Sequence, residues 1–190
     1  MSGPSAGALQ ARLARVRLLI LDVDGVLTDG SLGGGEPRSR RWNVKDGFGV
    51  YLARRGGLAL ALCSGNDHPE IRERAERLGV TQLRLGRIDK GAAVRELLDA
   101  LDVAQGEALF VGDDLFDLPG MRAAGLGACP ADAATELHAR CDWVLSARGG
   151  HGAVREAIEG ILRARGEWDA LVAPFIEGRG PAGDEEAARG

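Results

Sequence analysis

The fold is decided by residues 17–28, which read RLLILDVDGVLT. The part from Arg17 to Val23 is nearly all apolar and rich in leucine and β-branched residues, which is typical of a strand covered on both faces. It ends at Asp24 and Gly25, residue types that favour a turn. Short apolar runs recur at residues 58–62 and 108–111, and segments with helical spacing separate them. This alternation predicts repeated β-α units around a parallel sheet.

Apolar residues at helical spacing mark the expected helices. One helix is expected to begin at His68 and Pro69 with Asp67 as its N-cap, and to end at Gly79. We therefore predict an α/β fold, a Rossmann-like three-layer α/β/α domain with a central parallel sheet. The stripes expected to face that sheet are Ile71, Ala75 and Leu78; Val94, Leu97, Leu98 and Leu101; and Val154, Ile158, Ile161 and Leu162.

The length of 190 residues suits a single domain. We expect this domain to span residues 14–177, between flexible tails at residues 1–13 and 178–190 that have little to bury. A glycine-rich and then basic stretch at about residues 30–46 has no helical period. Because it is too short for a separate cap domain, it is expected to form a β-hairpin flap over the strand ends.

Composition argues against several classes of protein. The net charge of −4 is small and basic residues have acidic neighbours, so no nucleic-acid partner is expected. Cys63, Cys129 and Cys141 are widely separated, which favours neither a disulfide framework nor a zinc site. No apolar run approaches the ~18 residues of a membrane span, and the first residues lack the pattern of a signal peptide. We expect a soluble, cytoplasmic protein with no membrane partner.

Acidic residues cluster at two of the expected strand ends. Asp22 and Asp24 close the first strand, and Asp113, Asp114 and Asp117 follow the third. The carboxyl ends of parallel strands meet at one edge of a sheet, where ligands collect, so the two clusters are expected to lie together. Their oxygens suit Mg²⁺, a hard cation that binds one or two carboxylates, here Asp22 and Asp113, with a backbone carbonyl near Asp24 available to complete the set. For either cluster alone, a polar turn or a helix cap is the alternative.

Two further features suit a phosphate group. Ser64 and Gly65 follow the second apolar run, where a hydroxyl and free N–H groups are available to phosphate oxygens, and Lys90 supplies a positive charge. Each feature alone is weak evidence. In order, however, the chain shows DxDG, a strand-end Ser-Gly, a Lys and GDDxxD on successive β-α units, and this combination is highly specific.

The four-part pattern resembles the haloacid dehalogenase-like superfamily of aspartate-nucleophile phosphotransferases, over about residues 17–165. Within it, LDVDGVLTDG, the NVKDGFG of residues 43–49 and the GGHGAVRE of residues 149–156 are similar to the cap-less subgroup of 3-deoxy-D-manno-octulosonate 8-phosphate phosphatases. Sialic-acid-type 9-phosphate phosphatases are close relatives there. The resemblance implies an Mg²⁺-dependent phosphatase that releases phosphate from 3-deoxy-D-manno-octulosonate 8-phosphate in lipopolysaccharide biosynthesis.

The resemblance also implies the roles of individual residues. Asp22 is expected to attack phosphorus and form an aspartyl-phosphate, and Asp24 to act first as general acid and then as general base. The assigned residues are Asp22, Asp24 and Lys90 as catalytic groups; Asp22, Asp24 and Asp113 as ligands of Mg²⁺; Asp114 and Asp117 around the metal's waters; and Ser64, Gly65, Asn66, Asn43, Lys45 and Asp46 at the substrate and its phosphate.

Some of these residues have alternatives or depart from the family pattern. Asp46 is equally suited to cap a helix that begins at Gly47, and Lys45 to be a solvated loop charge. Asn66 stands where octulosonate phosphatases usually carry arginine, and an amide cannot form arginine's bidentate pair with a sugar-acid carboxylate. His151 also replaces a frequent arginine. A 9-phosphate of KDN or sialic acid as substrate, or a non-catalytic sugar-phosphate-binding domain, therefore remains an alternative.

The assembly is expected from the same resemblance. A cap-less domain leaves its cleft open to water, and relatives of this subgroup cover the cleft by tetramerising. We therefore expect a homotetramer, with the flap and residues 168–175 at its interfaces.

Overall fold

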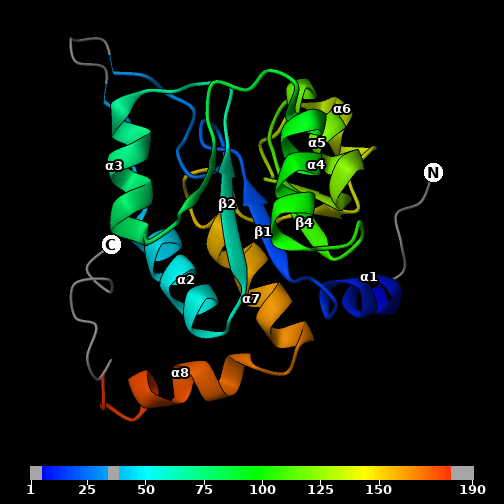
Figure 1. The fold of residues 1–190 in the computed structure, drawn as a ribbon. Coiled ribbons are helices and arrows are strands. Elements are labelled where there is room, and N and C mark those ends of the chain that lie inside the picture. The colour runs from blue at the N-terminus through cyan, green and yellow to red at the C-terminus, as the bar shows by residue number, and fades with distance from the viewer. Residues whose placement is uncertain (1–5, 34–38, 181–190) are drawn as a thin grey trace.

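The computed structural model describes residues 6–33 and 39–180. Within them, a six-stranded parallel sheet has the order β3-β2-β1-β4-β5-β6 (Figure 1). The strands are β1 (Leu18–Leu21), β2 (Ala59–Cys63), β3 (Gln82–Arg84), β4 (Ala108–Val111), β5 (Gly125–Cys129) and β6 (Trp143–Val144). The helices are α1 (Ala6–Leu13), α2 (Val44–Arg55), α3 (Pro69–Leu78), α4 (Lys90–Leu101), the 3₁₀ turn η1 (Leu115–Asp117), α5 (Leu118–Ala124), α6 (Thr135–His138), α7 (Ala153–Ala164) and α8 (Trp168–Ile176).

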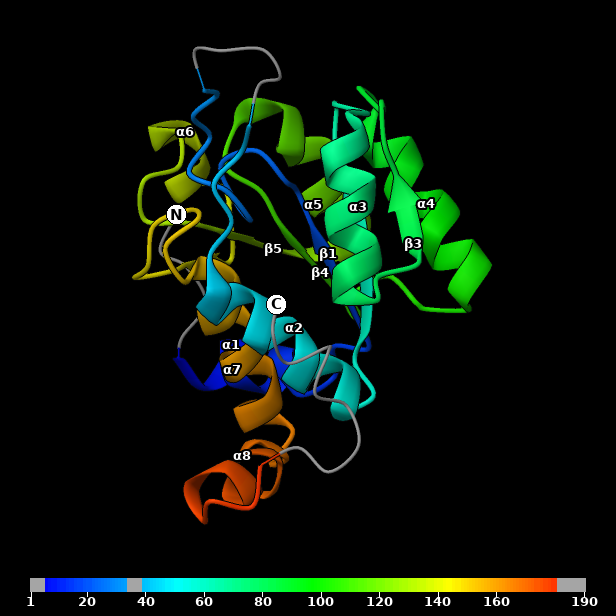
Figure 2. The same ribbon diagram turned by 90° about the vertical axis from the view of Figure 1, so that its left-hand side faces the viewer.

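Strand β1 sends its side chains alternately to two hydrophobic cores. Leu18 and Ile20 pack with residues of α4, α5 and α6, whereas Leu19 and Leu21 pack with residues of α1, α2, α3 and α7. Figure 1 shows α3 and α4 on opposite sides of β2, and Figure 2 shows α2 and α7 together below the sheet. The predicted three-layer α/β/α fold is confirmed, since both faces of the apolar strand are covered.

The register of the central strands places their ends side by side. Leu21 pairs with Leu62 of β2 and with Val111 of β4. The residues that follow these strands therefore emerge at the same edge of the sheet. This edge is where the acidic clusters and the Ser-Gly pair of the sequence come together.

The N-terminal region differs from the expected tail. Residues 6–13 form helix α1, and its last residue, Leu13, is buried in the core beside α7. Arg12 of the same helix binds the carboxylate of Asp142 and the carbonyl oxygen of Gly125. The prediction of a flexible tail is thus wrong for residues 6–13, because one leucine and one arginine give this short helix partners. Residues 1–5, and 181–190 of the predicted C-terminal tail, lie outside the described residues.

Two helices begin one to three residues away from the predicted caps. Asn43, not Asp46, caps α2, and its side-chain oxygen accepts a hydrogen bond of 2.8 Å from the N–H of Lys45. At α3 the cap is His68, whose ring accepts from the N–H of Glu70, and Pro69 is the first helical residue. The predicted cap at Asp67 was wrong and the cap alternative for Asp46 is not seen, for the same reason: several polar residues in a row can each cap a helix.

Asp67 is instead paired with Arg72, at 2.6 Å, on the exposed side of the α3 start. Gly79 ends α3 in the left-handed conformation, with φ of +64°, as predicted.

The stretch predicted as a flap is tied at its base. Thr28 and Trp42 form an antiparallel bridge, and the N–H of Gly33 donates to the carbonyl of Ser39 at 3.3 Å. Residues 34–38, where a hairpin tip would fall, lie outside the described residues. In the part of the chain that is described, no helix has the length and apolar character to cross a membrane.

Candidate active site

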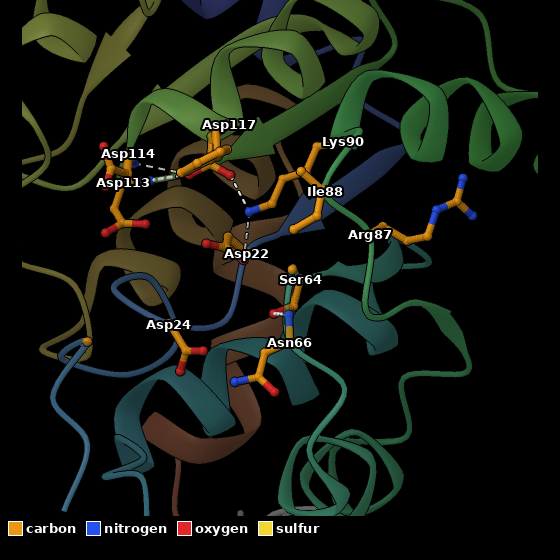
Figure 3. Close-up of a pocket in the computed structure, with 13 residues that line it drawn as sticks. Asp22, Asp24, Ser64, Asn66, Arg87, Ile88, Lys90, Asp113, Asp114 and Asp117 are labelled. Atoms are coloured by element: carbon orange, nitrogen blue, oxygen red, sulfur yellow. Dashed lines mark hydrogen bonds and ion pairs between the residues drawn. The ribbon is translucent and has the colours of Figure 1, made fainter.

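A cavity of about 410 Å³ opens at the carboxyl ends of β1, β2 and β4 (Figure 3). The loops after these three strands and the start of α4 surround it. The residues that line it are Asp22, Asp24, Gly30, Ser64, Gly65, Asn66, Arg87, Ile88, Lys90, Asp113, Asp114, Phe116 and Asp117.

Lys90 bridges two buried carboxylates beside this cavity. Its Nζ lies 2.9 Å from an oxygen of Asp22 and 2.5 Å from an oxygen of Asp117. Burial alone would lower the pKa of Lys90, but the two carboxylates outweigh it, so the pKa of Lys90 is raised. The site therefore contains a fixed positive charge next to Asp22.

The carboxyl groups respond to burial in the opposite sense. Desolvation, aided by the charge of Asp117, raises the pKa of Asp22 to about 7 against the attraction of Lys90. The same two causes raise the pKa of Asp113 to about 7. One ammonium group thus does not balance the carboxylates around it, and the site is short of positive charge.

Glycines allow the two acidic loops to approach each other. Gly25 has φ of +86°, and a Cβ built on it would lie 2.1 Å from Oδ2 of Asp113. The second loop is held by Asp117, whose Oδ2 accepts hydrogen bonds from the N–H groups of Asp113, at 2.8 Å, and Asp114, at 3.1 Å. The DxDG spacing is therefore a packing requirement of this site.

Three carboxylates are placed to hold a cation. Ligand oxygens of Asp22, Asp113 and Asp117 all lie within 4.8 Å of one another. Asp117 is already bonded by Lys90 and two N–H groups, which leaves Asp22 and Asp113 with more lone pairs for a metal. Two carboxylates and an open cavity fit Mg²⁺, which usually keeps several waters. These residues therefore fit the predicted cation, with Asp117 as the group that positions them.

Asp24 lines the same cavity, and its carboxylate is bound by an arginine. Nε of Arg40 donates to Oδ1 of Asp24 at 2.6 Å, and Nη2 donates to Oδ2 at 3.1 Å. The Asp24 carboxylate is therefore not in the group of three carboxylates that are placed to hold a cation. A ligand role for the main-chain carbonyl of Asp24 stays a prediction.

The comparisons with known proteins agree with this site. Residues 41–125 match the family model described as haloacid dehalogenase-like hydrolase. The chain is 38% identical over 169 residues to the 3-deoxy-D-manno-octulosonate 8-phosphate phosphatase of Escherichia coli K12, covering 88% of this chain and 90% of the relative. The chain belongs to this family of haloacid dehalogenase-like phosphatases. The resemblance seen in the sequence is thereby confirmed.

Solved structures show the same fold in this family. The phosphatase from Yersinia pestis is 37% identical, covers 87% of this chain and 90% of its own, and superposes with a TM-score of 0.83. The enzyme from Moraxella catarrhalis, solved with magnesium, phosphate and KDO, is 31% identical, with coverage of 90% and 99% and a TM-score of 0.86.

The Ser-Gly motif of the phosphatase family lies where the sequence placed it. Ser64 is buried at the end of β2, and its Oγ accepts a hydrogen bond of 3.1 Å from the N–H of Asn66. Gly65 and Asn66 line the cavity beside it. In Figure 3 the Asn66 amide and the Asp24 carboxylate lie on the same side of Asp22. These residues are thus close to the nucleophile candidate, as their assigned role requires.

The three flap-side residues assigned to the substrate lie outside this cavity. The Asn43 side chain caps α2 and donates to the carbonyl of Gly150 at 3.1 Å, while Lys45 borders a separate cavity beside Phe48. Asp46 is buried and accepts from the N–H groups of Gly152, at 3.1 Å, and Arg155, at 2.8 Å.

Of the two roles considered for Asp46, neither is seen. Its carboxylate instead holds the N-terminus of α7, a helix more than a hundred residues away in the chain. Within the described residues, substrate contact by these three residues is therefore not supported by their position in a single copy of the chain.

Five residues at the site were missed from the sequence. Four of them line the cavity, Gly30, Arg87, Ile88 and Phe116, and the fifth, Arg40, binds Asp24. The guanidinium of Arg87 is held by Glu96 through bonds of 2.9 and 2.6 Å, and in Figure 3 it points away from Asp22. The proximity of Arg87 and Ile88 to Lys90 was the available signal for two of them, whereas nothing distinguishes Arg40 from the basic residues around it.

Proposed function

We propose that this chain hydrolyses the phosphate ester of 3-deoxy-D-manno-octulosonate 8-phosphate through an aspartyl-phosphate on Asp22. The observation that carries the proposal is the cavity in which Asp22, Lys90 and Asp113 meet, in a chain similar over most of its length to phosphatases of that name. The phosphate release assigned to those relatives requires a nucleophile, a proton donor and positive charge at one point, and this cavity has residues for each.

In the first step, a carboxylate oxygen of Asp22 attacks phosphorus. The new bond from Asp22 to phosphorus forms as the bond from phosphorus to the sugar oxygen breaks, and Asp24 supplies the proton that this oxygen needs. Lys90 keeps Asp22 oriented at 2.9 Å and offsets part of the charge of the transferred group. Ser64 and the N–H groups of its loop are close enough to the cavity to bind the phosphate oxygens.

In the second step, water replaces the sugar oxygen. Asp24, now ionised, removes a proton from the water, whose oxygen attacks phosphorus and displaces the Asp22 carboxylate. Inorganic phosphate leaves and Asp22 is regenerated. Mg²⁺ bound by Asp22 and Asp113 supplies the positive charge that the site lacks, which reduces the repulsion between carboxylate and phosphate.

The direct test is phosphate release from a substrate panel with and without Mg²⁺. It contains 3-deoxy-D-manno-octulosonate 8-phosphate, the 9-phosphates of KDN and sialic acid, and common hexose phosphates. Mg²⁺-dependent preference for the octulosonate ester supports the proposal, and preference for a 9-phosphate supports the alternative substrate that the departure at Asn66 leaves open. No release from any ester contradicts the proposal and favours a sugar-phosphate-binding domain.

We further propose a cytoplasmic homotetramer. Its support is apolar surface at the cavity mouth, where Ile88 is 69% and Phe116 66% exposed in the single chain. The three cysteines carry free thiols, which suits a reducing compartment. Light scattering of the protein as it elutes from a size-exclusion column measures the mass of the assembly. The mass of a monomer at micromolar concentration would contradict the tetramer.

A further inference from the structure

Arg40, in the stretch predicted as a flap, makes two hydrogen bonds to Asp24, the acid/base candidate. Its guanidinium donates side-on to both oxygens of Asp24, at 2.6 and 3.1 Å. The side chain of Arg40 is 2% exposed, whereas that of Asp24 is 33% exposed and faces the cavity. A buried, forked arginine holds a carboxylate in one orientation, unlike a mobile surface ion pair.

A second carboxylate fixes Arg40 from the other side. Glu70, in the first turn of α3, lies 3.5 Å from Nη1 of Arg40 and accepts from the backbone N–H of Arg40 at 3.0 Å. The same Glu70 accepts from the indole N–H of Trp42 at 3.1 Å. The segment from Arg40 to Trp42 is thereby anchored to α3 at two points, and a guanidinium that turned away from Asp24 would also lose its ion pair with Glu70.

The Asp24 side chain has no other hydrogen-bond partner among the residues that the structure describes. Ionised carboxylate oxygens have about four acceptor positions in all, so the two bonds from Arg40 leave positions on the cavity side for a proton or a water. The arrangement therefore sets the direction of Asp24 without using up its capacity for proton transfer.

We propose that Arg40 orients the carboxylate of Asp24 for proton transfer, and that Glu70 holds Arg40 in the position required for this. The inference rests on the proposed phosphatase activity. Proton transfer requires the acid or base within hydrogen-bond reach of the reacting oxygen, so a carboxylate that is free to rotate transfers protons less efficiently. Arg40 acts through Asp24 and contacts neither phosphorus nor the attacking oxygen in either step.

The test compares two esters that differ in their need for an acid. The sugar oxygen of an octulosonate phosphate leaves only with a proton, whereas p-nitrophenolate leaves from p-nitrophenyl phosphate without one. We expect Arg40→Gln to lower kcat for the sugar ester by about a hundredfold. With the aryl ester, the same variant should retain a stoichiometric burst of nitrophenolate followed by slow turnover, because only the hydrolysis of the aspartyl-phosphate still requires Asp24.

Three further variants make the result decisive. Arg40→Lys keeps the positive charge but not the two-pronged contact, so its kcat for the sugar ester should lie between those of wild type and Arg40→Gln. If Arg40→Gln does not fold, Arg40→Lys takes its place in the test. Glu70→Gln keeps an acceptor for the N–H groups of Arg40 and Trp42 and should retain the burst with a smaller loss of turnover. Arg41→Gln changes an exposed arginine of the same strand and should behave as wild type.

The outcomes separate the inference from the function on which it rests. Equal loss of the burst and of sugar-ester turnover in Arg40→Gln or Arg40→Lys would show a purely structural role, and unchanged turnover of both esters would show no role; either result overturns the inference. A wild-type protein that releases phosphate from neither ester contradicts the proposed function instead.

Discussion

Lys90 lies between Asp22 and Asp117, with its ammonium nitrogen 2.9 Å from the first carboxylate and 2.5 Å from the second. It is the first residue of α4 and the one cation that the described residues place against the buried carboxylates of the cavity. A helix N-terminus does not favour a lysine, so the position is explained by the carboxylates and not by the helix. The same ion pair therefore stabilises the fold and positions Asp22 in the cavity.

We expect Lys90→Met to remove both catalysis and stability. The variant leaves Asp22, Asp113 and Asp117 without a compensating charge, and breaking such a buried pair costs about 3–5 kcal/mol in the free energy of unfolding. Denaturant unfolding without metal measures the loss, and Lys45→Met, at an exposed lysine, is the control that should change little. Lys90 lowers the pKa of both Asp22 and Asp113, so in its absence these carboxyls take up protons at a higher pH, and the loss should shrink as the pH falls toward about 7.

Asp22→Asn should abolish turnover and leave the fold intact. The amide cannot attack phosphorus, and loss of a nucleophile of this kind lowers kcat by more than about 10⁴-fold. Lys90 keeps Asp117 as a partner, and the neutral side chain relieves the repulsion between buried carboxylates, so Tm should not fall. Asp99→Asn, at an exposed residue of α4, is the matched control. Turnover at the wild-type rate in the Asp22 variant would remove Asp22 from the mechanism.

Stabilisation by Mg²⁺ should depend on pH in a defined direction. The pKa of Asp22 is 3.8 in an exposed carboxyl and about 7 in the fold, so between these values the folded metal-free protein holds protons that the unfolded chain has lost. The contribution of Asp22 to stability is therefore present at low pH and is lost as the pH rises through this window. Mg²⁺ binds the ionised form of Asp22, so the increase in the protein's Tm on adding Mg²⁺ should become larger as the pH rises above about 7.

Thermal unfolding across this pH range, with chelator or with Mg²⁺, measures both effects. Asp113 shares the raised pKa and contributes in the same direction. An increase in Tm by Mg²⁺ that is equal above and below about pH 7 would mean that the metal is not held by these two groups.

The sequence was sufficient to predict the sheet and the positions of the acidic clusters. Leu18 to Leu21 carry no polar residue, so only a strand covered on both faces suits them, and parallel order then places Asp22 and Asp113 at one edge. These conclusions depend on local pattern and on a general rule of topology. They required no knowledge of which side chains touch.

The contacts of Asp24, Arg40 and Asp46 were beyond the reach of the sequence pattern. Arg40 binds a carboxylate sixteen residues earlier, and Asp46 caps a helix 106 to 109 residues later. Neither spacing follows a helical or strand period. Both residues stand in polar stretches where several neighbours have the same chemistry, so only the folded chain shows which of them is buried.

The last prediction tests the role that the structure gives to Asp46. Burial raises the pKa of Asp46, and the N–H groups of Gly152 and Arg155 oppose this by stabilising its ionised form. Asp46→Ala leaves both donors at the start of α7 without their acceptor and should lower the free energy of unfolding by about 2 kcal/mol.

The KM for the phosphate ester should not change in this variant, because Asp46 does not line the cavity around Asp22. Asp46→Asn, which keeps one acceptor oxygen, should recover part of the stability. Chemical denaturation and steady-state kinetics on the two variants separate the alternatives: a rise in KM without loss of stability would restore Asp46 to the substrate site, whereas loss of stability at constant KM identifies it as the cap of α7.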